Sequence, residues 1–176
     1  MTSFRTVGSR TVAEEAFLHI TRATITTPNG DTVKRVVINH PGAVAVVPIL
    51  DGDVFLIDQY RAALDRNLLE IPAGKLDVPG EDRDEAARRE LEEEIGFTPG
   101  RLDHLTDLLT TPGFCDEVIT IYRATDLAPV PTNPIGAEEE HATIVRISLA
   151  EAVDRVREGS ITDAKTVVGL LLTAGQ

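Results

Sequence analysis

The segment Glu81 to Gly96, EDRDEAARRELEEEIG, decides how this chain folds, because it combines a helical pattern with an unusual charge pattern. We predict a helix that begins near Asp82 and ends at Gly96, a residue type that commonly stops helices. Its apolar residues recur at helical spacing and form one stripe: Ala87, Leu91 and Ile95. The helix is therefore expected to pack against a core along that stripe.

Three acidic residues of this helix, Glu90, Glu93 and Glu94, stand at positions i, i+3 and i+4, so they share one face. Their mutual repulsion in water costs only about 0.2 to 0.5 kcal/mol per pair, so a solvated, charged outer face is one interpretation. The other is a cation site, because carboxylate oxygens are the ligands that Mg²⁺ prefers. The apolar stripe beside the cluster and the Gly/Pro loop before it favour the second interpretation.

The residues before this helix predict strands. Ala43 to Leu50 is an almost continuous apolar run, Asp51-Gly52-Asp53 is a turn, and Val54 to Tyr60 is a second strand. A third β-like segment, Leu68 to Ile71, leads through Pro72-Ala73-Gly74 into a loop over Lys75 to Gly80. The core of a sheet is expected here.

The flanking segments complete the predicted fold. A polar N-terminal arm precedes a hairpin in which Phe17 to Thr27 and Thr32 to Asn39 flank a turn at Pro28-Asn29-Gly30-Asp31. After Gly96 we expect strands at Leu102 to Leu109, Val118 to Ala124 and Thr143 to Ile147, then helices at Ala150 to Glu158 and Thr162 to Ala174. This pattern predicts an α/β sandwich with a mixed sheet, in which residues 1–40 form an arm and hairpin and residues 41–176 form the main domain.

Composition limits the partners of the chain. It has 176 residues, and 29 acidic residues against 17 Lys and Arg give a net charge of −12, which disfavours a nucleic acid polymer. A small phosphorylated substrate remains possible if divalent cations offset the repulsion. The single cysteine, Cys115, excludes an internal disulfide, and no apolar run is long enough for a membrane span or a signal peptide. We expect a cytoplasmic protein.

The helix and the loop before it resemble the signature of the Nudix hydrolase family. In that signature a glycine, five residues, a glutamate and seven residues precede Arg-Glu, an aliphatic residue, any residue, Glu-Glu, any residue, Gly and an aliphatic residue. The matching residues here are Gly74, Glu81, Arg89-Glu90-Leu91, Glu93-Glu94 and Gly96-Phe97. Six residues instead of five separate Gly74 from Glu81, and Phe97 replaces the aliphatic residue. An insertion in a loop is tolerated easily, so it affects the path of the loop more than the acidic cluster.

The resemblance implies an α/β/α Nudix sandwich and a set of site residues. Glu90 and Glu94, with help from Glu93, would bind Mg²⁺ or Mn²⁺, and the Ala73 carbonyl would add a ligand. Arg89 would orient the glutamates and Glu81 would be an outer member. The catalytic set would comprise Glu139, Glu93 and Arg89. Glu139 is the favoured base, with Glu138 and Glu140 as alternatives in the same acidic run, which is otherwise a solvated surface segment.

Further segments are similar to the ADP-ribose pyrophosphatase branch of the family. They are Gln59-Tyr60-Arg61, Leu69 to Gly74, Thr111 to Glu117, and Pro112, which lies 16 residues beyond Gly96. By this resemblance Arg61 and Glu70 would bind the substrate and Phe114 would pack near it. The alternatives are an exposed arginine, a turn-capping glutamate and a core aromatic residue. Cys115 is expected to be a buried or half-buried thiol without a nucleophilic role.

The predicted function is metal-dependent hydrolysis of a nucleoside diphosphate sugar, with ADP-ribose giving AMP and ribose 5-phosphate. One alternative is hydrolysis of another nucleotide sugar or a dinucleotide. Others are a nucleotide sensor with a Nudix fold that does not cleave its ligand, and a structural domain with a solvated acidic helix. The resemblance also implies a homodimer that exchanges N-terminal strands, which would give residues 17–39 a role.

Overall fold

The computed structural model describes residues 3–132 and 141–175, which fall into two compact units. The N-terminal unit comprises Met1–Gly42 with Leu109–Val118, and the larger unit comprises Ala43–Leu108 with Ile119–Gln176. Each unit is described by itself. All the helices in the described ranges are too short or too polar to span a membrane.

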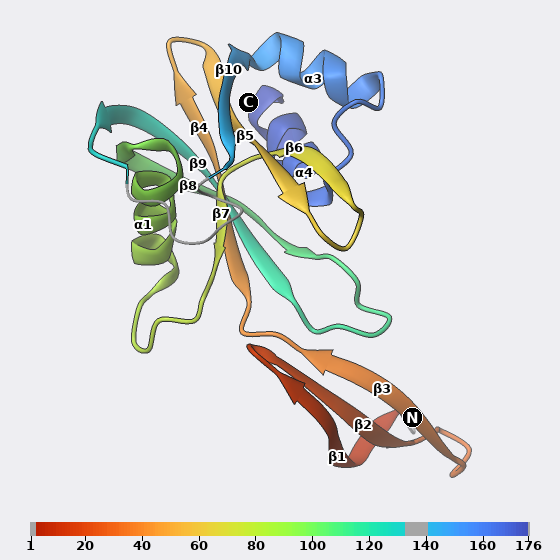
Figure 1. Cartoon of the computed structure of the whole chain (residues 1–176). Coiled ribbons are helices and arrows are strands. Elements are labelled where there is room, and N and C mark those ends of the chain that lie inside the picture. The colour runs from red at the N-terminus through yellow and green to blue at the C-terminus, as the bar shows by residue number, and fades with distance from the viewer. Residues whose placement is uncertain (1–2, 133–140, 176) are drawn as a thin grey trace. The chain divides into compact units, whose positions relative to one another are not determined.

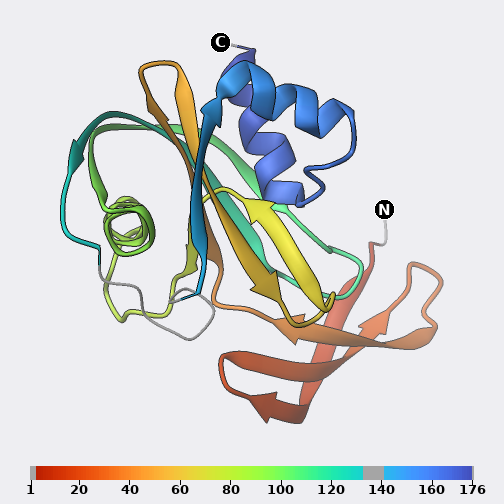
Figure 2. The ribbon, with the colours of Figure 1, turned by 45° about the horizontal axis from the view of Figure 1, so that its top comes forward.

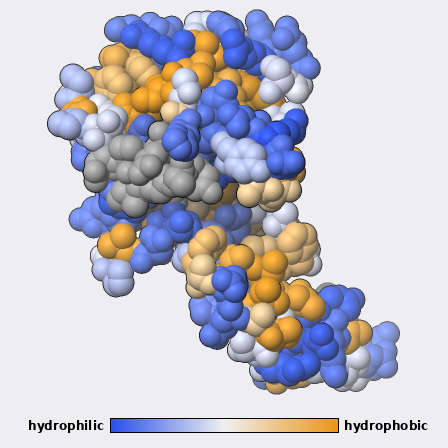
Figure 3. Space-filling model, in the orientation of Figure 1, coloured by the Kyte–Doolittle hydropathy of each residue, from blue (hydrophilic) through white to orange (hydrophobic). Residues whose placement is uncertain are grey.

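The N-terminal unit is a three-stranded antiparallel sheet in the order β1 (Arg5–Glu15), β2 (Leu18–Thr26) and β3 (Thr32–Asn39). The predicted hairpin is confirmed as β2 and β3. The predicted arm is instead mostly strand β1, and every residue of β1 is exposed, so no buried face imposes an apolar alternation on its sequence. Figure 3 shows apolar patches on the surface of this unit, whose exposed large apolar residues include Phe4, Val7, Val12 and Val36.

The segment 109–118 belongs to this unit because β3 holds it by backbone hydrogen bonds. The Ile38 N–H donates to the Phe114 carbonyl at 2.7 Å, and the Asp116 N–H donates to the Ile38 carbonyl at 3.1 Å. One carboxylate oxygen of Asp116 also accepts from the His40 N–H at 2.8 Å. The loop around Phe114 is therefore anchored at the end of β3.

A mixed sheet forms the centre of the larger unit, with the strand order β10-β5-β4-β9-β8, and with β6 beside β5 and β7 beside β4. The bounds are β4 (Ala43–Leu50), β5 (Asp53–Arg61), β6 (Arg66–Glu70), β7 (Ala73–Lys75), β8 (Phe97–Leu109), β9 (Val118–Pro129) and β10 (Thr143–Ser148). β4 and β9 are parallel, whereas β4 and β5 are antiparallel. The predicted strands are all present, and β7 is an addition within a segment that the sequence assigned to a loop.

Helices cover both faces of this sheet, as Figures 1 and 2 show: α1 (Arg83–Ile95) on one face, and α3 (Leu149–Arg157) with α4 (Ala164–Ala174) on the other. Alternate residues of β4 serve the two cores, because successive side chains of a strand point to opposite faces. Ala45 and Val47 pack in the core beneath α4, and Val44 and Val46 pack in the core beneath α1. The predicted α/β sandwich with a mixed sheet is confirmed.

Helix α1 has the termini that the sequence predicted. Asp82 caps it, because its carboxylate accepts from the Glu85 N–H at 2.8 Å while the Glu85 carboxylate accepts from the Asp82 N–H at 3.3 Å. Gly96 ends it in the left-handed conformation at φ 72°, where glycine carries no steric penalty. These caps set where α1 begins and ends.

Candidate active site

The acidic face of α1 lies against the short strand β7, which pairs with β4. The Ala73 N–H donates to the Glu94 carboxylate at 3.0 Å. Glu90 is 7% exposed, so its carboxylate is nearly withdrawn from water. The predicted apolar stripe of Ala87, Leu91 and Ile95 is buried in the core beneath the helix, which confirms that α1 is half-buried beside its acidic cluster.

Gly74 is the residue that allows the Glu90 carboxylate to approach the backbone of β7. A Cβ atom built on Gly74 would lie 1.8 Å from both Cδ and Oε1 of Glu90. No residue other than glycine fits at this position unless Glu90 moves. The backbone of residues 73 and 74 therefore forms a cradle for two carboxylates of α1.

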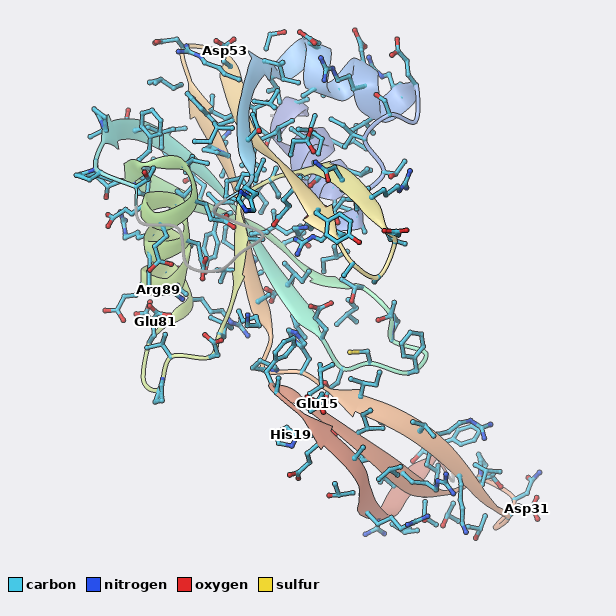
Figure 4. The ribbon with its side chains drawn as sticks, viewed as in Figure 1. Glu15, His19, Asp31, Asp53, Glu81 and Arg89 are labelled. Carbon is cyan, nitrogen blue, oxygen red and sulfur yellow. The ribbon has the colours of Figure 1, made fainter. Side chains whose placement is uncertain are left out.

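Arg89 hydrogen-bonds three carboxylates: that of Glu90 in the cradle and two others. Its Nε and Nη2 donate to the two oxygens of Glu81 at 2.8 and 3.0 Å, and its Nη1 donates to Glu90 at 2.7 Å and to Glu93 at 3.0 Å. Figure 4 shows Glu81 and Arg89 side by side near the N-terminal end of α1. Hydrogen bonds to Glu81, followed by the charge of Glu90, outweigh partial burial and hold the pKa of Arg89 above its ordinary value. Arg89 is thus a fixed cation among acidic groups.

The acidic cluster of α1 has the oxygen donors of a metal site, but other groups hold these oxygens by hydrogen bonds. No three His, Cys, Asp or Glu side chains of residues 3–132 and 141–175 converge as they stand on a single metal position. The reason is visible in the contacts: Arg89 holds Glu90 and Glu93, and the Ala73 N–H holds one oxygen of Glu94. Two carboxylates on a cradle that a Cβ would fill nevertheless supply the hard oxygen donors that Mg²⁺ or Mn²⁺ takes. A cation could bind here only after small movements of these side chains.

A second charged cluster lies at the ends of β5 and β6. Arg61 Nε and Nη2 donate to the two oxygens of Glu70, both at 2.7 Å, which is the bidentate geometry of a strong pair. Burial acts to raise the pKa of Glu70, but the hydrogen bonds from Arg61 and the charge of Lys165 outweigh it and leave that pKa below its ordinary value. Arg61 is therefore paired rather than simply exposed, and the Glu70 carboxylate, 1% exposed, makes an ion pair instead of capping a turn.

Sequence reasoning did not find three residues of this cluster, Asp163, Lys165 and Thr166, at the start of α4. Lys165 donates to Glu70, and to Asp163 at 3.0 Å. The available signal was a lysine on the inward face of an otherwise apolar helix, since the buried positions of α4 are Lys165, Thr166, Gly169, Leu170 and Thr173. A charged residue on such a face requires a partner.

Two other predicted positions, Phe114 and Cys115, belong to the N-terminal unit. Phe114 lies in the N-terminal unit and is 53% exposed, so the alternative of a core aromatic residue is wrong. Cys115 is half-buried, as expected for a thiol of this kind. The predicted base Glu139, with Glu138 and Glu140, lies outside the described residues.

Comparison with known proteins places these observations in a family. A NUDIX domain model matches residues 39–167. A methanol dehydrogenase activator from Bacillus methanolicus is 40% identical over 81% of this chain and 77% of its own length. An ADP-ribose pyrophosphatase from Mycobacterium tuberculosis is 39% identical over 96% of this chain and 82% of its own length. A crystal structure of an ADP compounds hydrolase matches with a TM-score of 0.82 at 30% identity, covering 98% of this chain and 93% of that one.

Proposed function

Because this chain belongs to the Nudix hydrolase family, we propose that it hydrolyses the pyrophosphate bond of a nucleoside diphosphate sugar, with ADP-ribose as the first candidate. Water adds to one phosphorus and the bridging P–O bond breaks, so ADP-ribose gives AMP and ribose 5-phosphate. One structural observation carries the proposal: the buried Glu90 and the neighbouring Glu94 lie against a glycine cradle at β7. A solvated acidic face would not need that arrangement.

Enzymes of this group generally depend on divalent metal ions. We propose that Glu90 and Glu94 hold the ion, which we take to be Mg²⁺ or Mn²⁺, with Glu93 and the Ala73 carbonyl as further ligands. When bound, such an ion neutralises phosphate oxygens and lowers the pKa of a water molecule. The net charge of −12 makes this neutralisation necessary, since the protein and a pyrophosphate otherwise repel each other.

The other proposed roles follow from contacts of the described side chains. Arg89 holds Glu90 and Glu93 in place and is itself held by Glu81, so it keeps the carboxylates oriented. Glu70 accepts hydrogen bonds from one side of the Arg61 guanidinium group, and we assign the other side of that group to the substrate phosphates. We propose Glu139 as the base because its acidic segment resembles the one that carries the base in this branch of the family, and Glu138 and Glu140 are the alternatives.

We also propose that the protein acts as a homodimer. The support is the fully exposed strand β1 and the exposed apolar residues Phe4, Val7 and Val12, which a second copy would cover. Light scattering at micromolar concentration should give twice the chain mass, and a monodisperse monomer would contradict the proposal.

The experiment for the function compares Mg²⁺-dependent turnover of ADP-ribose, UDP-glucose, GDP-mannose and diadenosine polyphosphates by the wild type and by Glu94→Gln. Release of AMP from ADP-ribose, lost in the variant, is the expected result. Preferential turnover of another compound would replace ADP-ribose as substrate and keep the chemistry. Tight nucleotide binding without turnover of any compound would overturn the enzymatic role in favour of a sensor.

A further inference from the structure

Lys165 is a buried cation that none of the proposed catalytic steps uses. It lies in the first turn of α4 and is 7% exposed. Its Nζ contacts one carboxylate oxygen of Glu70 and lies 3.0 Å from a carboxylate oxygen of Asp163. A buried ammonium group with two carboxylate partners is stable only in a fixed geometry, so these contacts constrain both partners.

The same turn of α4 also holds the backbone that follows Glu70. Asp163 Oδ2 accepts from the Thr166 N–H at 3.0 Å and from its hydroxyl at 2.6 Å. The Thr166 hydroxyl oxygen in turn accepts from the Ile71 N–H at 2.9 Å. The Glu70 side chain and the Ile71 backbone are therefore both fixed by the start of α4. Ile71 lies two residues before Ala73, whose N–H donates to Glu94.

The charges of the cluster explain why an ammonium group is needed. Arg61 and Lys165 carry two positive charges and Glu70 and Asp163 carry two negative ones, so the group is neutral and the outer side of Arg61 can attract a phosphate. Without Lys165 the net charge becomes −1, and one oxygen of the buried Glu70 loses a partner. The Arg61 side chain is 41% exposed, so a substrate can reach it.

The Arg61 guanidinium group also interacts electrostatically with Glu94 on the acidic face of α1. Its hydrogen bonds to Glu70 are the largest of the effects that raise its pKa, and the negative charge of Glu94 adds to them. The Arg61 guanidinium group and the Glu94 carboxylate therefore belong to the same region of the larger unit.

We propose that Lys165 is a positioning residue for substrate binding: it fixes the Glu70 carboxylate, which orients the Arg61 guanidinium toward the phosphates of the substrate. This inference rests on the proposed function and adds to it a residue that acts only through Glu70 and Arg61. A lysine that merely stabilised α4 would affect the unfolding temperature without any specific coupling to Arg61.

The test is a double-mutant cycle of Lys165→Met and Arg61→Met, with KM, kcat and the unfolding temperature measured for each protein. Loss of orientation should raise KM about tenfold in Lys165→Met, the effect of weakening one charge-assisted phosphate contact. The double variant should have the KM of Arg61→Met alone, because Lys165 has nothing left to position. Lys165→Arg should recover part of the lost affinity, since it keeps the positive charge.

Leu170→Ala is the matched control, because it removes a fully buried side chain from the same helix without touching the charged cluster. It should lower the unfolding temperature and leave KM unchanged. Additive KM effects in the cycle, or a rise in KM for Leu170→Ala equal to that of Lys165→Met, would overturn the proposal. If Lys165→Met does not fold, Lys165→Gln takes its place in the cycle.

The positioning role of Lys165 can be tested separately from the proposed enzymatic function. If the wild type cleaves GDP-mannose in place of ADP-ribose, the same cycle is measured with GDP-mannose. If no compound is cleaved, the cycle is measured as the Kd of ADP-ribose by calorimetry, and non-additive Kd values would support the positioning role while the enzymatic role fails. Absence of any binding would overturn both.

Discussion

Replacing Gly74 by alanine should greatly lower turnover while leaving the fold intact. The added Cβ would lie 1.8 Å from Cδ and Oε1 of Glu90. To reach 3.4 Å, the near limit of ordinary contact, the atoms must separate by roughly 1.6 Å. The carboxylate is the end of a flexible side chain, whereas the Gly74 backbone is tied to β4 opposite Val44, so Glu90 is the group that moves.

The two consequences of this movement differ in size. The cost to stability should be about 1 kcal/mol, near the lower limit for overpacking, because a side chain rotation relieves the clash. The cost to turnover should be about 100-fold or more, because a displacement of about 1 Å in a group that organises the reaction has that effect. Affinity for Mn²⁺ should fall as well, since Glu90 is a proposed ligand.

The assay combines three measurements on the wild type and on Gly74→Ala: urea unfolding, Mn²⁺ binding by calorimetry, and Mg²⁺-dependent hydrolysis of ADP-ribose. Gly8→Ala is the control, because it adds the same methyl group where no other atom of the described residues, its chain neighbours aside, lies within 4 Å of the new Cβ. If the Gly74→Ala variant folds normally and its turnover stays within about twofold of that of the wild type, the cradle does not hold a functional carboxylate.

Three further outcomes are expected from other contacts. Arg89→Gln should destabilise the metal-free protein by about 1 to 3 kcal/mol in urea unfolding, because carboxylates lose their shared cation, and Mg²⁺ should restore part of the loss; absence of this rescue would contradict the cation site. Glu70→Gln should weaken the pH dependence of the free energy of unfolding. The pKa of Glu70 is lowered in the folded state, so the stability that its carboxylate contributes is fully present above its unfolded pKa of about 4.5. That stability is lost as the pH falls through the folded-state pKa. Unfolding curves from pH 7 to pH 3 that match the wild type would exclude this. Gly169→Ala should lower stability by about 1 to 3 kcal/mol in calorimetry despite a better helix former, since the new Cβ would lie 2.8 Å from Val47 Cγ2; a stabilised protein would show that α4 shifts freely.

The parts of the fold that could be predicted most directly are those in which burial shapes the sequence. Strand β4 lies between two cores and is an almost continuous apolar run, and α1 places Ala87, Leu91 and Ile95 on one buried stripe. Local signals fixed the ends of α1, because Asp82 and Gly96 are strong capping residues. Strand β1 could not be predicted, since all its residues are exposed.

The parts of the site that could not be predicted depend on contacts between residues distant in the sequence. Glu90, Glu93 and Glu94 were found from their spacing along one helix, but the cradle at Gly74 requires β7, a strand of three residues that pairs with β4. Lys165 meets Glu70 across 95 residues of sequence, and a spacing rule does not connect them. Such pairs appear only when the tertiary fold is known.

We propose that the carboxylates of α1 against β7 bind the divalent cation that hydrolysis requires. The most direct test is a crystal of the protein grown with Mn²⁺ and examined by anomalous diffraction. We expect an anomalous peak within coordinating distance of Glu90 and Glu94, with the contacts of Arg89 to Glu90 rearranged. Mn²⁺ bound elsewhere, with Glu90 and Glu94 still held by Arg89 and the Ala73 N–H, would contradict it.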